Sequence, residues 1–152
     1  MARNKLPLGV LQTCDNPEVI NSLELFGCYF LSLCFVGNVD EYKIYELYKS
    51  CVKAGYLLED CYVSNPVGIL RLAGTQCIDV RFSSSFEYGK LNVVMTQKDH
   101  STHFMVLDRD GRIAYNPAPD HFLTDLSLTR SFRVFEFSEK DQRSLAVRHL
   151  TS

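Results

Sequence analysis

The sequence predicts an α+β fold in which an N-terminal helical half packs on a C-terminal antiparallel sheet. Apolar residues recur at helical spacing in the segments before Gly74, whereas after it they alternate with polar residues as in strands. Helices and strands are therefore segregated along the chain, which is typical of α+β folds and not of parallel sheets with crossover helices. With 152 residues and no linker-like tract, residues 1–152 are expected to form one domain.

Four helices are predicted after an extended N-terminal arm at residues 1–16, and a fifth near the C-terminus. Pro17 suits the first turn of a helix that Asn16 can cap. Gly27 interrupts this helix, and a new one begins at or near Cys28. The new helix is apolar on nearly all sides, so we expect it to be buried. The predicted helices cover residues 17–25, 28–36, 40–54, 66–72 and 138–149.

Five strands are predicted, over residues 78–82, 91–96, 103–108, 112–115 and 131–137. The third and fourth are joined by Asp110-Gly111, the strongest hairpin signal in the chain. If these two residues form the whole loop, His103 faces Ala118, and Asn116 is the diagonal neighbour of His103 on the same face of the sheet. A change of one residue in loop length would move the two side chains to opposite faces.

The composition argues against several classes of function. Hydrophobic residues make up 46% of the chain and charged residues 22%, which is typical of a folded domain and not of a disordered one. The net charge is -2 and the basic residues are scattered, so we expect neither nucleic acid nor a membrane as a partner. No apolar run is long enough for a signal peptide or a membrane span, and we expect a cytoplasmic protein.

The cysteine pattern favours neither a metal site nor a disulfide framework. None of the six cysteines forms a Cys-x-x-Cys pair, and the four histidines do not stand at ligand spacing to them. Several cysteines are therefore expected to be core residues in a reducing compartment. No metal and no organic cofactor is implied.

Cys28 is the candidate nucleophile. At the first turn of a helix, unpaired backbone N–H groups and the helix dipole stabilise a thiolate, and the same N–H groups can bind an oxyanion. If Cys28 is paired with His103 at this helix start, we expect the pKa of the thiol to lie below its ordinary value, because charge, hydrogen bonding and the dipole all favour the thiolate. Taken alone, the position fits a buried core cysteine behind a helix-breaking glycine equally well.

His103 and Asn116 form the candidate base and its orienting partner. An amide beside an imidazole fixes the tautomer of a general base. Either residue alone is common in strands and turns, but the pair in this register is less so.

The segments Gly-Cys-Tyr-Phe-Leu-Ser-Leu, from Gly27, and His-Phe-Met-Val-Leu-Asp-Arg-Asp-Gly-Arg-Ile-Ala-Tyr-Asn-Pro, from His103, resemble the papain-like cysteine peptidase superfamily. They are similar to bacterial peptidases that cut double-glycine leader peptides. They also resemble a phage- and plasmid-borne bacterial family of uncharacterised papain-like domains. The resemblance spans about residues 21–119 and includes the order Cys, His, Asn, with the Asn before a proline.

This resemblance implies a Cys28–His103–Asn116 triad in a thiol protease or related amide hydrolase. Such peptidases usually carry a Gln before the nucleophile as an oxyanion donor. Residues 21–26 contain none, and Asn21 is the substitute candidate.

Two further residues stand in reserve in case the predicted register is wrong. His100 is the reserve base, and Asp120 is the reserve orienting residue.

The implied substrate is a peptide, a protein or peptidoglycan. The alternative is a catalytically inactive papain-fold protein that binds or inhibits, for example a phage-encoded factor acting on a host protein. Tyr29, which stands where small residues are frequent, keeps this alternative open.

Overall fold

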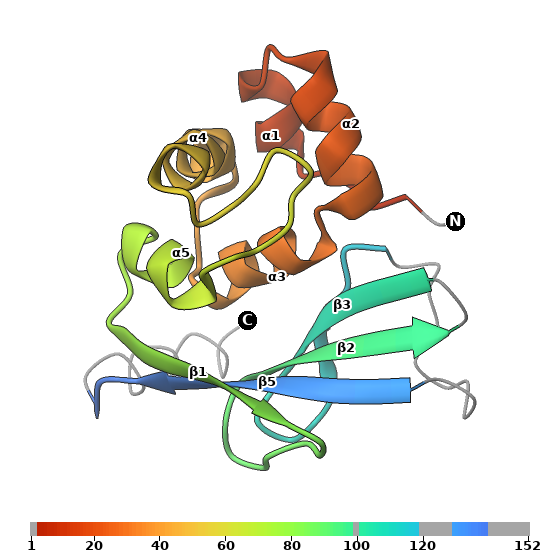
Figure 1. Ribbon diagram of the computed structural model, residues 1–152, viewed down its shortest axis with the longest axis vertical. Coiled ribbons are helices and arrows are strands. Elements are labelled where there is room, and N and C mark those ends of the chain that lie inside the picture. Colours follow the sequence, from red (N-terminus) through yellow and green to blue (C-terminus); the bar gives the residue numbers. More distant parts are fainter. Residues whose placement is uncertain (1–2, 99–100, 119–128, 140–152) are drawn as a thin grey trace.

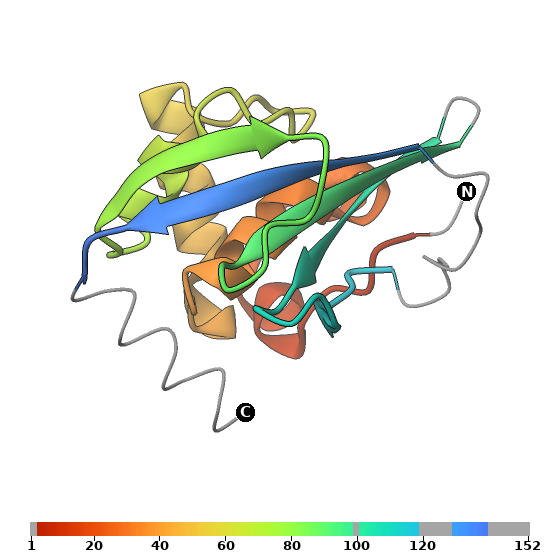
Figure 2. The ribbon, with the colours of Figure 1, turned by 90° about the horizontal axis from the view of Figure 1, so that it is seen from below.

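The computed structural model describes residues 3–98, 101–118 and 129–139 (Figure 1). A group of helices precedes a five-stranded antiparallel sheet and lies on one of its faces, as the two perpendicular views show (Figures 1 and 2). The predicted α+β class, with helices first and strands second, is confirmed. The helix predicted over 138–149 falls almost entirely outside the described residues.

The helical part contains five α-helices and one 3₁₀ helix among the described residues. They are α1 (Leu8–Thr13), α2 (Pro17–Phe26), α3 (Cys28–Val36), η1 (Glu41–Lys43), α4 (Ile44–Ala54) and α5 (Pro66–Leu72). Asn16 caps α2 through its side chain, which accepts a hydrogen bond from the Glu18 N–H at 3.0 Å. The predicted positions of α2, α3 and α5 agree with the structure to within about one residue.

The N-terminal segment differs from the prediction, because an extended arm over residues 1–16 is wrong for residues 8–13. Helix α1 forms there and packs against η1, and its Val10 is fully buried in the core. A Cβ atom on Gly9 would lie 2.7 Å from the backbone of Glu41, so the two helices approach through a glycine. Burial of Val10 and this close approach hold a helix that is too short to be stable alone.

Helices α2 and α3 meet at Gly27 with a bend of 86°. The Gly27 N–H still donates to the Leu23 carbonyl at 3.0 Å, which ends α2. A Cβ at this position would lie 2.6 Å from the Leu23 oxygen, closer than real Cβ contacts. The bend therefore depends on the absence of a side chain, and it turns α3 into the interior.

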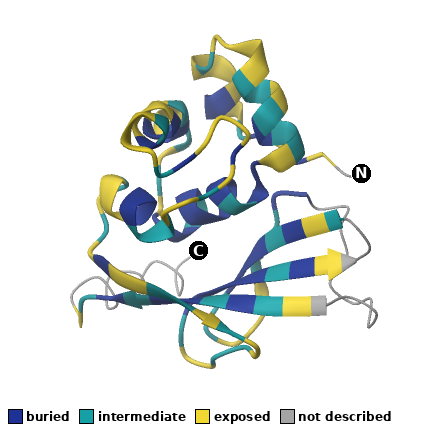
Figure 3. Ribbon diagram, in the orientation of Figure 1, coloured by how far each residue is buried: buried dark blue, intermediate teal, exposed yellow. Residues whose placement is uncertain are grey.

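Helix α3 forms the centre of the core. Its side chains are buried on nearly every side, as the dark ribbon in Figure 3 shows, and Phe30, Leu33 and Val36 are fully covered. It lies against strand β3, the strand that carries His103. The sequence-based prediction of a buried apolar helix is confirmed.

The sheet has the strand order β1-β5-β2-β3-β4. Its strands are β1 (Cys77–Ser83), β2 (Asn92–Lys98), β3 (Ser101–Leu107), β4 (Ile113–Tyr115) and β5 (Thr129–Phe137). Strand β5, the last along the chain, lies between β1 and β2 and pairs antiparallel with both (Figure 1). Strand β5 therefore joins β1 to the other strands of the sheet.

The β3–β4 hairpin has the predicted register, but its loop and pairing differ from the prediction. Its loop has three residues, because the Asp108 N–H donates to the Arg112 carbonyl at 2.8 Å and Gly111 adopts a left-handed φ of 87°. Such a loop shifts the register by one residue. A bulge shifts it back, since Leu107 pairs with Ile113 but Val106 pairs with Tyr115. The two-residue loop was wrong, yet the bulge restores the pairing that it had predicted.

No single helix in the described part of the chain is both long enough and apolar enough to cross a membrane. Helices α2 and α3 meet the length and composition criteria together, across their sharp bend.

Replacing Gly27 by Ala should destabilise the protein by about 1–3 kcal/mol, because the added methyl group meets the Leu23 backbone. Urea unfolding followed by circular dichroism measures the change. Gly37→Ala is the matched control, since Gly37 ends the same helix at a similar φ and its nearest new contact, at 3.2 Å, is a side chain. Equal unfolding midpoints for Gly27→Ala and wild type would contradict the role given to this glycine.

Candidate active site

Cys28 is the first residue of α3 and is 8% exposed. Its thiol receives hydrogen bonds from the backbone N–H groups of Phe104, Tyr29 and Cys28 itself. The last two belong to the first turn of the helix, where N–H groups have no partner within the helix. The thiol therefore lies where the start of α3 meets the backbone of β3.

Burial has the larger effect on this thiol. It raises the pKa of Cys28 above the ordinary value of 9.0, and the three backbone N–H groups offset only part of that rise. The expectation of a lowered pKa, which assumed pairing with His103 as well as the helix start, is wrong. Desolvation of the buried sulfur outweighs the hydrogen bonds and the helix start, so the resting residue is a neutral thiol.

His103 and Asn116 are hydrogen-bonded, with Nε2 of the imidazole 2.8 Å from Oδ1 of the amide. The same Oδ1 accepts the Ala118 backbone N–H at 3.0 Å. A backbone N–H can only donate, so this second bond identifies the amide oxygen and makes Nε2 the donor. In the neutral imidazole the lone pair is then on Nδ1, which is the nitrogen able to take up a proton.

Strand β3 relates the predicted nucleophile to the predicted base. The Phe104 amide that donates to Cys28 belongs to the residue directly after His103. Successive strand side chains point to opposite faces, so the Phe104 ring packs on the helical side while the imidazole points to the other. On the helical side the ring stacks on Tyr29, with ring centroids 4.3 Å apart. The thiol is thus next to the backbone of the base-bearing strand.

The N-terminal segment connects the two halves of this site. The buried Asn4 side chain donates to the Leu23 carbonyl at 2.8 Å, at the end of α2 just before Gly27. The next residue, Lys5, donates its backbone N–H to the Pro117 carbonyl at 2.7 Å, directly after Asn116. We call residues 4–5 the N-terminal brace. Its contacts span more than a hundred residues of sequence, and no local sequence signal indicated them.

The other sequence candidates do not join the cluster in the part of the chain that the structure describes. Asn21 is exposed on α2 and makes no side-chain hydrogen bond in the described segments. His100 and Asp120 lie outside the described residues. Among the described residues, the backbone N–H groups of Phe104, Tyr29 and Cys28 are the donors at the thiol.

A cleft of about 740 Å³ lies between the helices and the sheet, beside the triad residues. Cys61 in its wall is close enough to Cys28 for a Cys28 thiolate to raise the Cys61 pKa, although burial is the main cause of that rise, to about 12. Most lining side chains are apolar or aromatic. They include Phe26, Tyr29, Tyr62 and Val67 from the helical part, and Val80, Phe82, Met95, Phe104 and Arg133 from the sheet.

Arg133 is the lining residue that sequence reasoning missed. It shares a face of β5 with the buried Phe135 and Phe137, so a charge stands next to two buried aromatic residues on the helix-facing side. That pattern was visible in the alternation of the strand and could have marked a functional position.

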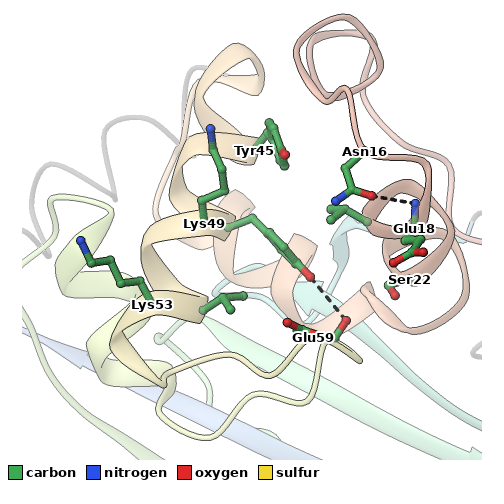
Figure 4. A pocket seen from close by; sticks show the side chains of 10 residues that line it. Asn16, Glu18, Ser22, Tyr45, Lys49, Lys53 and Glu59 are labelled. Atoms are coloured by element: carbon green, nitrogen blue, oxygen red, sulfur yellow. Dashed lines mark hydrogen bonds between the residues drawn. The ribbon is translucent and has the colours of Figure 1, made fainter.

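A second hollow, of about 420 Å³, lies between α2 and α4 (Figure 4). Its polar groups mainly serve helix ends and loops. Asn16 caps α2, and the Tyr48 hydroxyl donates to the Glu59 carbonyl at 3.4 Å. It holds neither a histidine nor a cysteine, and we assign it no role.

Metal binding finds no support in the described segments, where no three His, Cys, Asp or Glu side chains are grouped closely enough to hold an ion.

Comparison with known proteins gives one match. A family described as "Protein of unknown function, DUF261" matches residues 11–137, which include α2 to β5 and all three triad residues. Neither the curated proteins nor the solved structures gave a match.

Replacing Asn4 by Ala should lower the free energy of unfolding by about 0.5–1.5 kcal/mol, because one buried hydrogen bond to the Leu23 carbonyl is lost while the bond from the Gly27 N–H remains. Urea unfolding measures this loss. Asn21→Ala is the matched control, and as an exposed helix residue it should change stability by less than about 0.5 kcal/mol. Similar effects for the two variants would contradict the role of the N-terminal brace.

Proposed function

We propose that this chain, which belongs to the DUF261 family, is a cysteine hydrolase that cleaves an amide or peptide bond with a papain-like triad. One observation carries the proposal. A histidine hydrogen-bonded to an asparagine lies on a strand whose next amide donates to a cysteine at a helix start. The order Cys, His, Asn-Pro along the chain, and the packing of the cysteine helix on the histidine strand, support a papain-like fold.

In the first step, Sγ of Cys28 attacks the carbonyl carbon of the substrate, and His103 accepts the thiol proton at Nδ1. The backbone N–H groups of Cys28 and Tyr29 stabilise the negative charge that develops on the carbonyl oxygen. Collapse of this intermediate breaks the C–N bond, and the imidazolium gives its proton to the leaving amine. A thioester remains on Cys28.

Water completes the reaction. His103 removes a proton from the water as it attacks the thioester, and the returning proton regenerates the neutral thiol as the carboxylic acid leaves. Asn116 accepts the Nε2 hydrogen bond throughout and keeps the imidazole in one tautomer and one orientation.

The raised pKa of Cys28 determines how the nucleophile forms. Because burial opposes an isolated thiolate, the proposed mechanism has the thiol lose its proton to His103 during the attack. Activation therefore depends on His103 more than on the helix start. No metal or organic cofactor takes part in the proposed steps.

The cleft favours a peptide-like substrate, whether a peptide, a protein or peptidoglycan. Its lining is mainly apolar and aromatic, which suits a chain with side chains to bury.

The alternative, a catalytically inactive binding or inhibitor protein with the same fold, is favoured by two observations. They are the raised thiol pKa and the exposed position of Asn21. The two functions differ in whether His103 controls the reactivity of Cys28.

At pH 7, Cys28 should react with a peptidyl vinyl sulfone at least tenfold faster than Cys14, a partly exposed free cysteine in the same molecule. His103→Gln should slow Cys28 by about 10²–10⁴-fold, because glutamine can still donate to Asn116 but cannot accept a proton. Asn116→Ala should have a smaller effect, since it orients the base without ionising. Mass spectrometry of labelled peptides gives both rates in one sample.

The pH dependence tests the same mechanism. In His103→Gln, labelling of Cys28 should rise about tenfold per pH unit and keep rising through pH 9, because the unaided thiol must ionise against a raised pKa. Wild type should depend on pH much less steeply around neutrality. If Cys28 reacts no faster than Cys14 and is insensitive to His103, the inactive binding protein is the better interpretation.

A further inference from the structure

Arg133 projects from β5 into the cleft and is held there by aromatic rings. The carbon of its guanidinium lies 4.9 Å from the ring centroid of Phe82, 5.3 Å from that of Phe104 and 6.0 Å from that of Tyr29. Three rings around one guanidinium fix its plane and its position. Arg133 is therefore presented as a rigid charge in the wall of the cleft.

The guanidinium lacks an acidic partner in the described part of the chain. Nη1 donates to Ser131 Oγ at 2.6 Å, and Nη2 to the weak acceptor Met95 Sδ at 3.7 Å. Nε is buried and makes no hydrogen bond. Arg81 on the neighbouring strand β1 shows the usual solution, since it pairs with both Glu87 and Glu136.

A second unsatisfied group lies beside it. The Tyr29 hydroxyl is buried beside the Arg133 guanidinium, and among the described residues it makes no hydrogen bond of normal length and angle. Burial raises the pKa of Tyr29 to about 12, although the nearby charge of Arg133 partly offsets the rise. The hydroxyl therefore keeps its proton at neutral pH and can donate it. Two buried donors, one charged, thus lack an acceptor in the same cleft, and such groups are costly unless a ligand satisfies them.

The position relates these donors to the triad. Tyr29 directly follows Cys28, and Phe104 directly follows His103, so the stacked pair that supports Arg133 is covalently attached to both reactive residues. The other charged lining residue, Asp60, already accepts the Tyr62 N–H at 3.1 Å. A substrate held at Cys28 therefore runs past one fixed positive charge in an aromatic wall.

We infer that Arg133 and Tyr29 form a carboxylate-binding subsite, so that the preferred substrate is a peptide bearing a carboxylate close to the bond at Cys28. The carboxylate would accept from Nε–H and an Nη–H of Arg133 and from the Tyr29 hydroxyl. Its source is an acidic side chain or a chain-terminal carboxylate. The inference takes its substrate class from the proposed hydrolase, but the subsite itself requires only the cleft.

Peptide binding to the full chain carrying Cys28→Ala tests the subsite without catalysis. The probes are acetyl-Glu-Gly-amide against acetyl-Gln-Gly-amide, and acetyl-Leu-Gly with a free carboxylate against its amide. ¹H–¹⁵N spectra report the Nε–H signal of Arg133. We expect at least one charged probe to bind about tenfold more tightly than its neutral partner and to shift this signal. The pair that shows the preference identifies the source of the carboxylate.

Variants at the subsite complete the test. Arg133→Met in the same background should abolish the charge preference, and Tyr29→Phe should reduce it about threefold to tenfold while leaving the stacked ring in place. Equal binding of charged and neutral probes by the parent protein, or a preference that survives Arg133→Met, would overturn the inference. Because the parent comparison needs no mutation at Arg133, a poorly folded variant does not remove the test.

Failure of the subsite and failure of the hydrolase give different results. A reactive, His103-dependent Cys28 with no charge preference leaves the hydrolase without this specificity. A charge preference in a protein whose Cys28 is unreactive leaves a carboxylate-binding cleft without catalysis.

Discussion

The bend at Gly27 is the constraint on which the candidate site depends. Because Gly27 has no side chain, its backbone can lie against the Leu23 carbonyl. Helix α2 therefore ends and α3 begins within one residue, at nearly a right angle. The turn sends an apolar helix into the core and leaves its first N–H groups at the edge of the sheet. The thiol at Cys28, the stacked ring of Tyr29 and the cleft beside them are all positioned by the direction in which α3 leaves this glycine.

Burial explains the chemistry of the site as much as its position. The same enclosure that fixes Cys28 also opposes its ionisation, so in the proposed hydrolase the thiol depends on a base and not on the helix start alone. The cleft differs. Arg133 lies among aromatic rings there, and its buried Nε meets no acceptor among the described residues. Burial thus disfavours a negative charge on the Cys28 thiol, while the inferred subsite at Arg133 and Tyr29 favours a negative charge on a ligand.

Local patterns predicted the order of the elements and the pairing of His103 with Asn116, because helix breaks, caps and strand alternation depend on neighbouring residues. They failed where distant segments meet. The helix at residues 8–13 is stabilised by its packing against η1, and the buried Asn4 side chain donates a hydrogen bond to a carbonyl nineteen residues away. The predicted register of the hairpin is correct only because two features that could not be inferred, the three-residue loop and the bulge beside Val106, cancel each other. The thiol pKa depends on total enclosure, which a sequence does not display.

The position of β5 between β1 and β2 has a consequence for synthesis of the chain. Strands β1 and β2 are both complete before residue 99, yet neither pairs with the other, because each takes β5 as its neighbour. Until about residue 137 has emerged from the ribosome, the nascent chain holds two strand edges open, a state that is slow to resolve and prone to mispairing between molecules. The helical half can assemble earlier, but the sheet is complete only once β5 is present. Truncated products should therefore accumulate as aggregates and not as partly working domains.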